Sequence, residues 1–220
     1  MKTRSAIFLL ASAIFLFTVV PANALVYTFD NITNNNAADV AIGEKQLWVE
    51  VTDAGSGQVL FTFGNTGPGA SSICDVYFDD GTTLLGIASI DNTGPGVSFS
   101  QDASPGNLPG GNEISPSFVC TAGLSVESDS PTQPNGVNPG ETLGIIFDLQ
   151  TSLSFTDVLQ ALNSGDLRIG IHVQGFDSEG SESFINSAPV PEPATMLLFG
   201  SGLIGIAAIS GKKRFKKRNG

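Results

Sequence analysis

The sequence predicts an all-β fold, a β-sandwich of which a jelly roll is one arrangement, with one short helix. Three observations lead to this class. Short runs of alternating apolar and polar residues recur along residues 25–189, turns rich in Gly and Asn separate them, and ten of the fifteen phenylalanines fall in this stretch. About 165 residues are enough to bury one core, so we expect a single domain there.

The expected strands follow from this alternation and its interruptions. Residues 46–52 alternate with period two, residues 53–57 form a turn, and residues 59–63 resume the alternation, which is typical of a hairpin. The other runs with strand character are residues 26–29, 73–78, 84–90, 97–101, 118–122, 124–127, 142–149 and 167–176. The expected helix covers residues 157–162, with Thr156 as its N-cap and residues 163–165 as its end.

The first 24 residues have the parts of a secretory signal peptide. Lys2 and Arg4 precede an apolar run over residues 6–20, and Ala22 and Ala24 occupy the two small positions of an A-x-A cleavage site. The apolar run is short for a helix that spans a membrane. We therefore expect export through the secretory translocon, with signal peptidase cutting after Ala24, and an uncleaved anchor is the alternative.

The other end, residues 190–220, combines a Pro-Glu-Pro element, an apolar run and a basic tail. Residues 194–210 carry no charge and would span about 26 Å as a helix, slightly less than the hydrocarbon core of a bilayer. Six of the ten Lys and Arg residues lie in residues 212–218, which favours a cytoplasmic position for this tail. Pro191 and Pro193 keep the chain before the helix extended. The sequence thus predicts a C-terminal transmembrane helix.

This arrangement, VPEPATMLLFGSGL followed by a basic end, resembles the PEP-CTERM protein-sorting domain over about the last 30 residues. The resemblance implies that an exosortase, a membrane-embedded cysteine transpeptidase, recognises Pro191, Glu192 and Pro193. It also implies a Gram-negative host that makes extracellular polysaccharide. The chain would be anchored in the inner membrane until it is processed, and would then reach the cell surface or the extracellular matrix. Residues 75–81 and 167–182 are similar to uncharacterised members of such families, which implies no activity.

Charge is distributed very unevenly. Between Leu25 and Val190, only Lys45 and Arg168 are basic, against 20 acidic residues. Such a surface repels nucleic acid, so we expect no nucleic-acid partner. Diffuse acidity attracts divalent cations without building a site for one.

Carboxylates suggest two kinds of chemistry. Asp75, Asp79 and Asp80 offer the oxygen ligands that calcium prefers, but their spacing is not that of an EF-hand loop. A glycosidase needs paired carboxylates, and the candidates are Asp79, Asp80, Asp177, Glu179 and Glu182, although 20 acids produce such pairs by chance. The Asp-Asp-Gly sequence is better explained as a turn. Calcium therefore stays an alternative, and no other cofactor is expected.

Cys74 and Cys120 are the two cysteines of the chain. In an exported protein an even number of cysteines favours a disulfide. A disulfide that closes a loop of this length would stabilise the folded protein by about 4 kcal/mol at most, by chain-entropy estimates. The alternative is two buried thiols, because each cysteine stands among apolar residues.

Two side chains are candidates for a functional role. His172 is the single histidine, and strand alternation places it on a polar face beside Arg168 and Gln174, so we expect a solvated residue and no catalysis. Trp48 shares the polar face of its strand with Glu50, where its ring could stack on a sugar; packing against a second sheet is the alternative.

We therefore expect a non-enzymatic protein of the cell surface or extracellular matrix, associated with extracellular polysaccharide. A carbohydrate- or calcium-binding module in the same place is the alternative, and a polysaccharide hydrolase is a more distant one.

Overall fold

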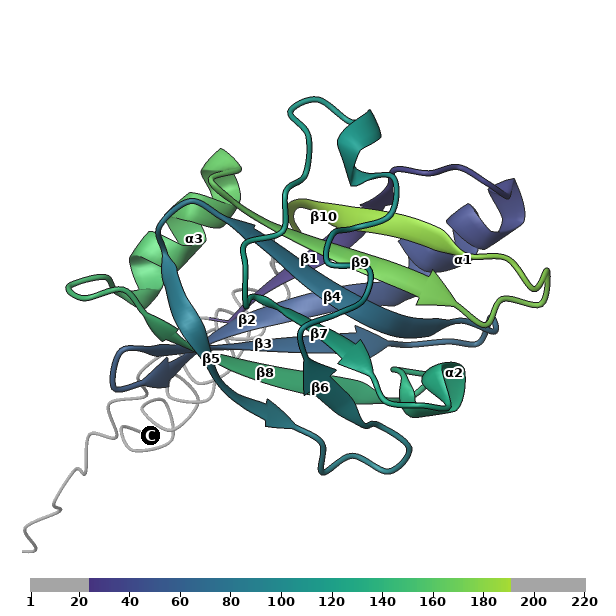
Figure 1. The fold of residues 1–220 in the computed structure, drawn as a ribbon, viewed down its shortest axis with the longest axis horizontal. Coiled ribbons are helices and arrows are strands. Elements are labelled where there is room, and N and C mark those ends of the chain that lie inside the picture. The colour runs from purple at the N-terminus through teal and green to yellow at the C-terminus, as the bar shows by residue number, and fades with distance from the viewer. Residues whose placement is uncertain (1–23, 191–220) are drawn as a thin grey trace, which may run out of the picture.

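The computed structural model describes residues 24–190, which form ten strands, three α-helices and a short 3-10 turn (Figure 1). The strands are β1 (Ala24–Asn31), β2 (Leu47–Gly55), β3 (Gln58–Asn65), β4 (Ser72–Asp80), β5 (Leu84–Asp91), β6 (Phe99–Gln101), β7 (Ser125–Ser128), β8 (Thr142–Leu149), β9 (Leu167–Gln174) and β10 (Glu182–Val190). The helices are α1 (Ala37–Gln46), α2 (Thr132–Asn135) and α3 (Phe155–Ser164). The all-β prediction is confirmed, and the expected hairpin is β2 and β3.

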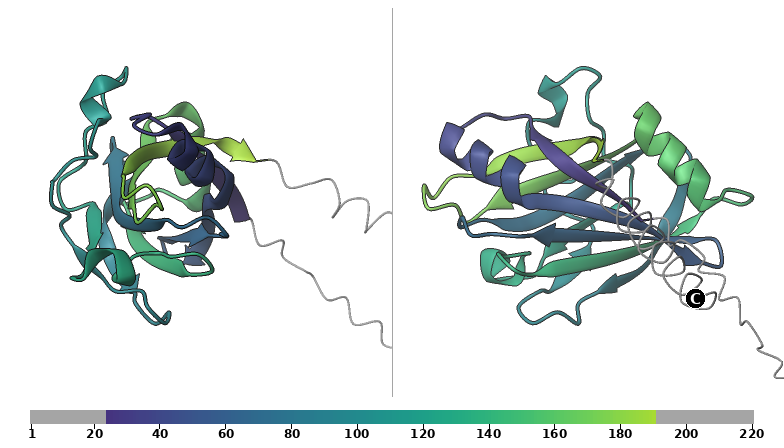
Figure 2. Two further views of the ribbon diagram at one scale, coloured as in Figure 1. Left: turned by 90° about the vertical axis from the view of Figure 1, so that its right-hand side faces the viewer. Right: turned by 180° about the vertical axis from the view of Figure 1, so that it is seen from behind.

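All ten strands belong to one antiparallel sheet, in the order β5-β8-β3-β2-β1-β10-β9-β4-β7-β6. The sheet curls until it nearly closes into a barrel (Figure 2). The predicted β-sandwich and jelly roll are therefore wrong. Alternating residues show that one face of each strand is buried, and that pattern is the same in a barrel and in a sandwich.

A single side chain links the two edge strands of this sheet. Asn92 lies directly after β5, and its Nδ2 donates to the carbonyl oxygen of Phe99 at the start of β6 (2.9 Å). Its Oδ1 accepts from the backbone N–H of Phe99, also at 2.9 Å. The amide thus makes the pair of hydrogen bonds that a neighbouring strand would make, and it bridges the gap between the edges.

Phenylalanines fill the inside of the barrel. The ring centroids of Phe61 and Phe78 are 5.1 Å apart, and those of Phe78 and Phe147 are 4.6 Å apart, all edge to face. These three side chains are fully buried. Edge-to-face pairs add about 0.5–1.5 kcal/mol each beyond the area that they bury.

Helix α3 covers one end of the barrel with its buried residues Val158, Ala161 and Leu162. It is longer than the expected helix, and its N-cap is Ser154, not Thr156. Ser154 forms a capping box with Asp157, which sequence inspection missed by choosing the next hydroxyl along. The expected end is confirmed, because Gly165 adopts the left-handed conformation with φ 81°.

Helix α1 covers the opposite end, and the sequence did not predict it. Asn36 caps it by accepting from Ala38 N–H at 2.9 Å. Gly43 faces the ring of Phe184 so closely that an added Cβ would lie 2.2 Å from the ring. The helix therefore packs through a glycine, and it lacks the apolar stripe by which amphipathic helices are recognised.

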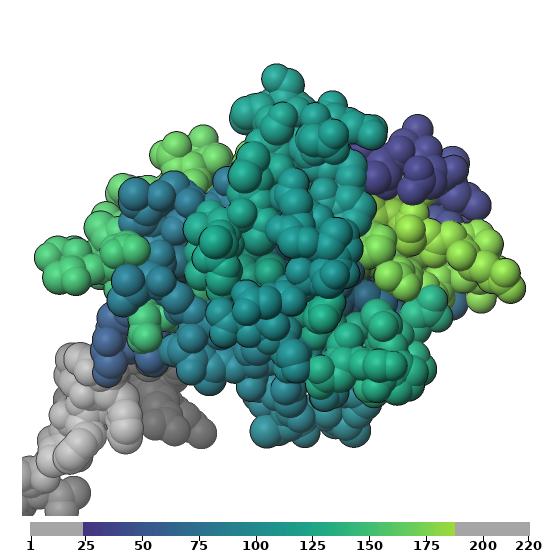
Figure 3. Space-filling view, in the orientation of Figure 1, coloured from purple at the N-terminus to yellow at the C-terminus, as the bar shows by residue number. Residues whose placement is uncertain are grey.

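A long loop, residues 102–124, forms a thin second layer on the outside of β4 and β9. Its side chains Ala103, Leu108 and Phe118 pack with Tyr77 of β4 into a small separate apolar cluster. The loop covers the middle of the face seen in Figure 3. The strand expected at residues 118–122 is absent, because this part of the chain belongs to the loop.

The two ends of the described chain leave the barrel side by side. Strands β1 and β10 are antiparallel neighbours, and Val26 near the start of β1 pairs with Val190 at the end of β10. Both ends therefore lie at the end of the barrel covered by α3 (Figure 2). Among residues 24–190, no helix is long and apolar enough to span a bilayer. The helix expected at residues 194–210 lies outside the described residues.

Candidate functional site

The outer face of β4 and β9 holds His172, and the structure corrects its environment. Asp75 and His172 are register partners, and Oδ2 of Asp75 lies 2.9 Å from Nδ1 of His172. The side chains are only 7% and 14% exposed. The polar-face placement beside Gln174 is confirmed, with Nε2 of Gln174 3.5 Å from Nδ1. His172 is nevertheless mostly buried and paired with a carboxylate, so the expectation of a solvated residue is wrong.

A bulge in β4 places Asp75 on this face. The pairing of β4 with β9 shifts register between Ile73 and Asp75, which makes Cys74 the extra residue. Both Ile73 and Val76 then point into the core, while Asp75 points outward toward His172.

A serine completes a row of three polar side chains across neighbouring strands. Ser183 of β10 is the register partner of His172, which in turn pairs with Asp75. A nucleophilic mechanism needs a hydrogen bond between the imidazole and the hydroxyl and also access for a substrate. The Ser183 hydroxyl is buried and has no hydrogen-bond partner among the described residues. The row therefore has the residue types of a triad without the contacts that activate a serine.

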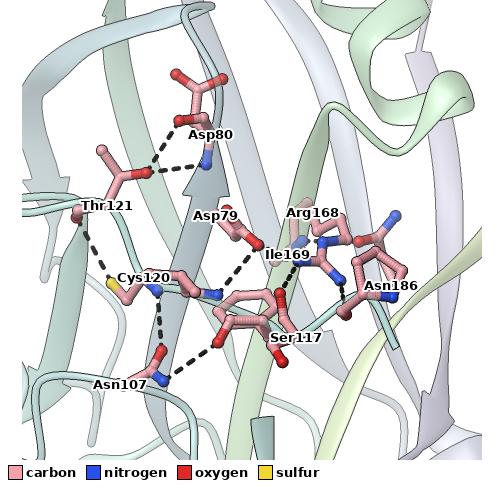
Figure 4. A network of polar contacts seen from close by, with 12 residues as sticks. Asp79, Asp80, Asn107, Ser117, Cys120, Thr121, Arg168, Ile169 and Asn186 are labelled. Atoms are coloured by element: carbon pink, nitrogen blue, oxygen red, sulfur yellow. Dashed lines mark hydrogen bonds and ion pairs between the residues drawn. The ribbon is translucent and has the colours of Figure 1, made fainter. Parts of the chain in front are cut away.

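Arg168 fastens the loop of residues 102–124 to the barrel (Figure 4). Its guanidinium forms an ion pair with Asp79 and donates to the carbonyl oxygens of Pro116 (2.8 Å) and Ser117 (2.5 Å). Its Cζ also lies 5.4 Å from the centre of the Phe118 ring. One of the two basic residues of the exported region is thus used to hold this loop.

The carboxylates considered for catalysis or calcium serve in turns and loops. Asp79 also accepts from the backbone N–H of Val119 at 3.1 Å, and Asp80 accepts from the backbone N–H groups of Thr83 and Leu84. The expected turn begins only at Gly81, because β4 extends through Asp79 and Asp80, and the Asp80 carboxylate binds the far side of that bend. The two carboxylates and that of Asp75 bind different partners and do not converge. No group of three or more potential metal ligands occurs in residues 24–190.

Glu182 is a buried carboxylate whose role differs from the one considered for it, since it organises the chain before α1 and does not pair with another acid. It accepts from Oγ1 of Thr33, Nδ2 of Asn31 and the backbone N–H groups of Asn35 and Asn36, at 2.5–3.1 Å. Burial raises the pKa of Glu182, but these hydrogen bonds outweigh it and leave the pKa below its usual value. The Asn-rich stretch before α1 could have indicated such a carboxylate, because its side-chain amides and the backbone N–H groups at the start of the helix need a hydrogen-bond acceptor.

The expected disulfide is not formed, and both cysteines are free thiols. The backbone N–H of Thr121 donates to the carbonyl oxygen of Phe78, so Cys120 lies opposite this part of β4. Phe78 is four residues beyond Cys74, about 13 Å along a strand. A disulfide requires Cα atoms within about 7 Å. The alternative of separate, largely buried thiols therefore fits the structure.

Trp48 lies on the outer face of β2, as predicted, and is half-buried. Its ring covers Gly64 of β3, where an added Cβ would lie 2.2 Å from Cζ2 of Trp48. Thr28 is its register partner on the other side, in β1. The ring therefore shields the backbone at Gly64, which has no side chain of its own to cover it. The loop of residues 102–124 packs on other strands.

Two hollows lie beside α3. The larger, of about 580 Å³, is lined by Gly81, Thr82, Thr83, Leu153, Asp157, Gln160, Ala161, Ser164 and Asp166. The smaller, of about 280 Å³, is lined by Leu162, Asn163, Ser164, Gly165, Arg168, Asn186 and Ser187. The second hollow lies where β9 and β10 separate, because their pairing ends at Gly170 and Ile185.

One of the expected cleavage residues lies at this same end. Ala24, the expected last residue of the signal peptide, is the first residue of β1 and pairs with Thr52. The other expected residues, Ala22, Pro191, Glu192 and Pro193, lie outside the described residues.

Together these features define a class: a β-barrel domain whose two chain ends meet at one end, with a signal expected after the last strand. Residues 189–214 match the family model of the PEP-CTERM protein-sorting motif. No curated protein and no solved structure matches the chain. The chain therefore carries a PEP-CTERM sorting signal, which marks an exported protein handled by exosortase-type machinery. The match begins inside β10, so the signal follows the barrel without a spacer.

Proposed function

We propose that the protein acts without catalysis at the cell surface or in the extracellular matrix, in association with extracellular polysaccharide. The strongest support is that the side chains most suited to catalysis bind each other or the outer loop. Asp75 and His172 bind each other, and Asp79 and Arg168 together hold the outer loop. These contacts stabilise the barrel and its outer loop and leave no converging pair of free carboxylates among them.

The processed protein, purified from its own host, tests this proposal. It should sediment with polysaccharide isolated from the same cells, and incubation should release no reducing ends from that polysaccharide. Release of reducing ends that is lost in the Asp79→Asn variant would contradict the proposal and favour a hydrolase.

A carbohydrate-binding module is the second candidate, and the position of Trp48 favours it. The ring is half-buried on an outer face that also carries Thr28 and Thr62. An aromatic ring beside hydroxyl groups suits the face of a sugar ring. Trp48→Ala should then weaken binding to the polysaccharide at least tenfold. Leu85→Ala, which removes an apolar side chain that is 60% exposed elsewhere, is the matched control and should bind normally.

A further inference from the structure

The α3 end of the barrel must lie close to the membrane if the chain is anchored by residues 194–210. Strand β10 ends at Val190, four residues before Ala194. At 3.3–3.6 Å per residue, four extended residues reach about 14 Å at most. The headgroup layer takes up roughly 5–8 Å of that distance. A protein that binds residues 191–193 of the anchored chain is therefore close enough to contact this end of the barrel.

The charge at this end restricts what it can contact. Asp53 follows the part of β2 that pairs with β1, and Asp166 directly precedes β9, so one exposed carboxylate stands on each side of the chain exit. Asp157 adds a third in α3. Lys45 belongs to α1 at the opposite end, and Arg168 is bound to Asp79 and the outer loop. Carboxylates are repelled by anionic headgroups, so the surface fits a protein partner better than lipid.

The end of β10 separates from β9. The register of β10 with β9 ends at Ile185, while its register with β1 continues to Val190. A side-chain contact, from the backbone N–H of Ile169 to Oδ1 of Asn186 at 2.7 Å, links the two strands further on. The smaller hollow opens at this separation. The smaller hollow therefore lies beside the point where β10 leaves the barrel.

We propose that the α3 end of the barrel, with Asp53 and Asp166 beside the chain exit, is the surface that docks on the membrane-embedded sorting transpeptidase. The partner surface is neutral or basic and sits at the outer headgroup layer. This inference rests on the sorting signal and on the register of β1 and β10, and it is independent of any association with polysaccharide.

The test is a pulse-chase measurement of processing in a host that contains the transpeptidase. Reversing both charges in Asp53→Lys/Asp166→Lys should slow processing about tenfold, because charges at the edge of an interface act mainly on the association rate. The control Asp177→Lys/Glu179→Lys makes the same charge change at two exposed positions of the α1 end and should process normally. If the reversal prevents folding, Asp53→Asn/Asp166→Asn replaces it, with about a threefold slowing expected.

A second measurement separates docking from other causes. Eight Gly and Ser residues inserted between Val190 and Pro191 remove the need for the barrel to touch the enzyme. The insertion should restore processing of the charge-reversed variant to within twofold of the wild-type rate. Equal slowing by both charge pairs, wild-type rates in all variants, or slow processing that the insertion leaves unchanged would each overturn the docking surface.

Discussion

At the scale of single residues, Glu182 shows how one carboxylate organises a stretch of chain. Its oxygens bind two side chains and two backbone N–H groups in the segment that leads from β1 to α1. Hydrogen bonds to a charged group contribute more than neutral ones, and a buried donor that loses its acceptor costs more still. The start of α1 therefore depends on a residue almost 150 positions away in the chain.

Glu182→Gln tests this dependence with little change of shape. The free energy of unfolding should fall by about 1–3 kcal/mol at pH 7, measured by urea denaturation. The pKa of Glu182 is depressed in the folded protein, so its contribution is present above the unfolded value of about 4.3 and is lost as the pH falls through the folded value. The difference between wild type and variant should therefore shrink at pH 3. Glu179→Gln, at an exposed position, should have no effect at either pH, and an equal difference at both pH values would contradict this role of the charge.

The cysteines give a second prediction at this scale. Burial raises the pKa of the Cys74 thiol to about 11, and it also raises that of Cys120. A thiol with a pKa of about 11 is almost fully protonated at pH 8 and reacts slowly. Two thiols per chain should react in guanidinium chloride without reductant, and Cys74 should stay unmodified in the folded protein. A mass two daltons lower with no reactive thiol would show a disulfide and contradict the structure.

At the scale of elements, local pattern predicted the strands that alternate cleanly and missed those that do not. Leu47, Val49 and Val51 point inward and are fully buried or nearly so, which the sequence showed. Strand β10 was missed because Glu182, Ser183, Asn186 and Ser187 make it look polar. Glu182 and Ser183 are nevertheless buried, beneath the chain of residues 31–36 that they contact. Such burial depends on residues far away in the chain, which the alternation of apolar and polar residues along a single strand does not reveal.

The outer loop is the element whose attachment is most easily tested. Arg168→Ala removes the ion pair to Asp79 and both bonds to the loop carbonyls, and should lower the free energy of unfolding by about 2–3 kcal/mol. Hydrogen exchange should become faster in residues 102–124 and stay unchanged in β2 and β3. Lys45→Ala removes the other basic residue of the described chain and should leave the exchange unaffected. Equal acceleration in all strands would show that Arg168 supports the whole barrel instead.

At the scale of the whole molecule, the barrel has one gap, and Asn92 bridges it. Asn92→Ala removes both hydrogen bonds to Phe99, so the free energy of unfolding should fall by about 1 kcal/mol, measured by chemical denaturation. Hydrogen exchange at the ends of β5 and β6 should become faster. Asn163→Ala, at an exposed position near the end of α3, is the matched control and should change neither quantity. Unchanged exchange in the Asn92 variant would mean that the edges are held together by other contacts.

The whole molecule also shows why sequence patterns gave the right class and the wrong architecture. Strand number and turn spacing follow from local composition, whereas the choice between a sandwich and a barrel depends on which strands pair. The decisive pairing here joins β1 to β10, the two ends of the described chain. That pairing also places the chain ends together, which links the fold to the way the protein is exported and sorted.

We propose that the exported barrel loses a signal peptide and a sorting signal at the same end, where β1 begins and β10 ends. Mass spectrometry of the protein isolated from a host with the sorting machinery tests it most directly. The isolated chain should begin at Leu25 and end close to the Pro191–Pro193 segment, without the basic residues that follow. An intact chain that still contains Lys2 and Arg218 would contradict it.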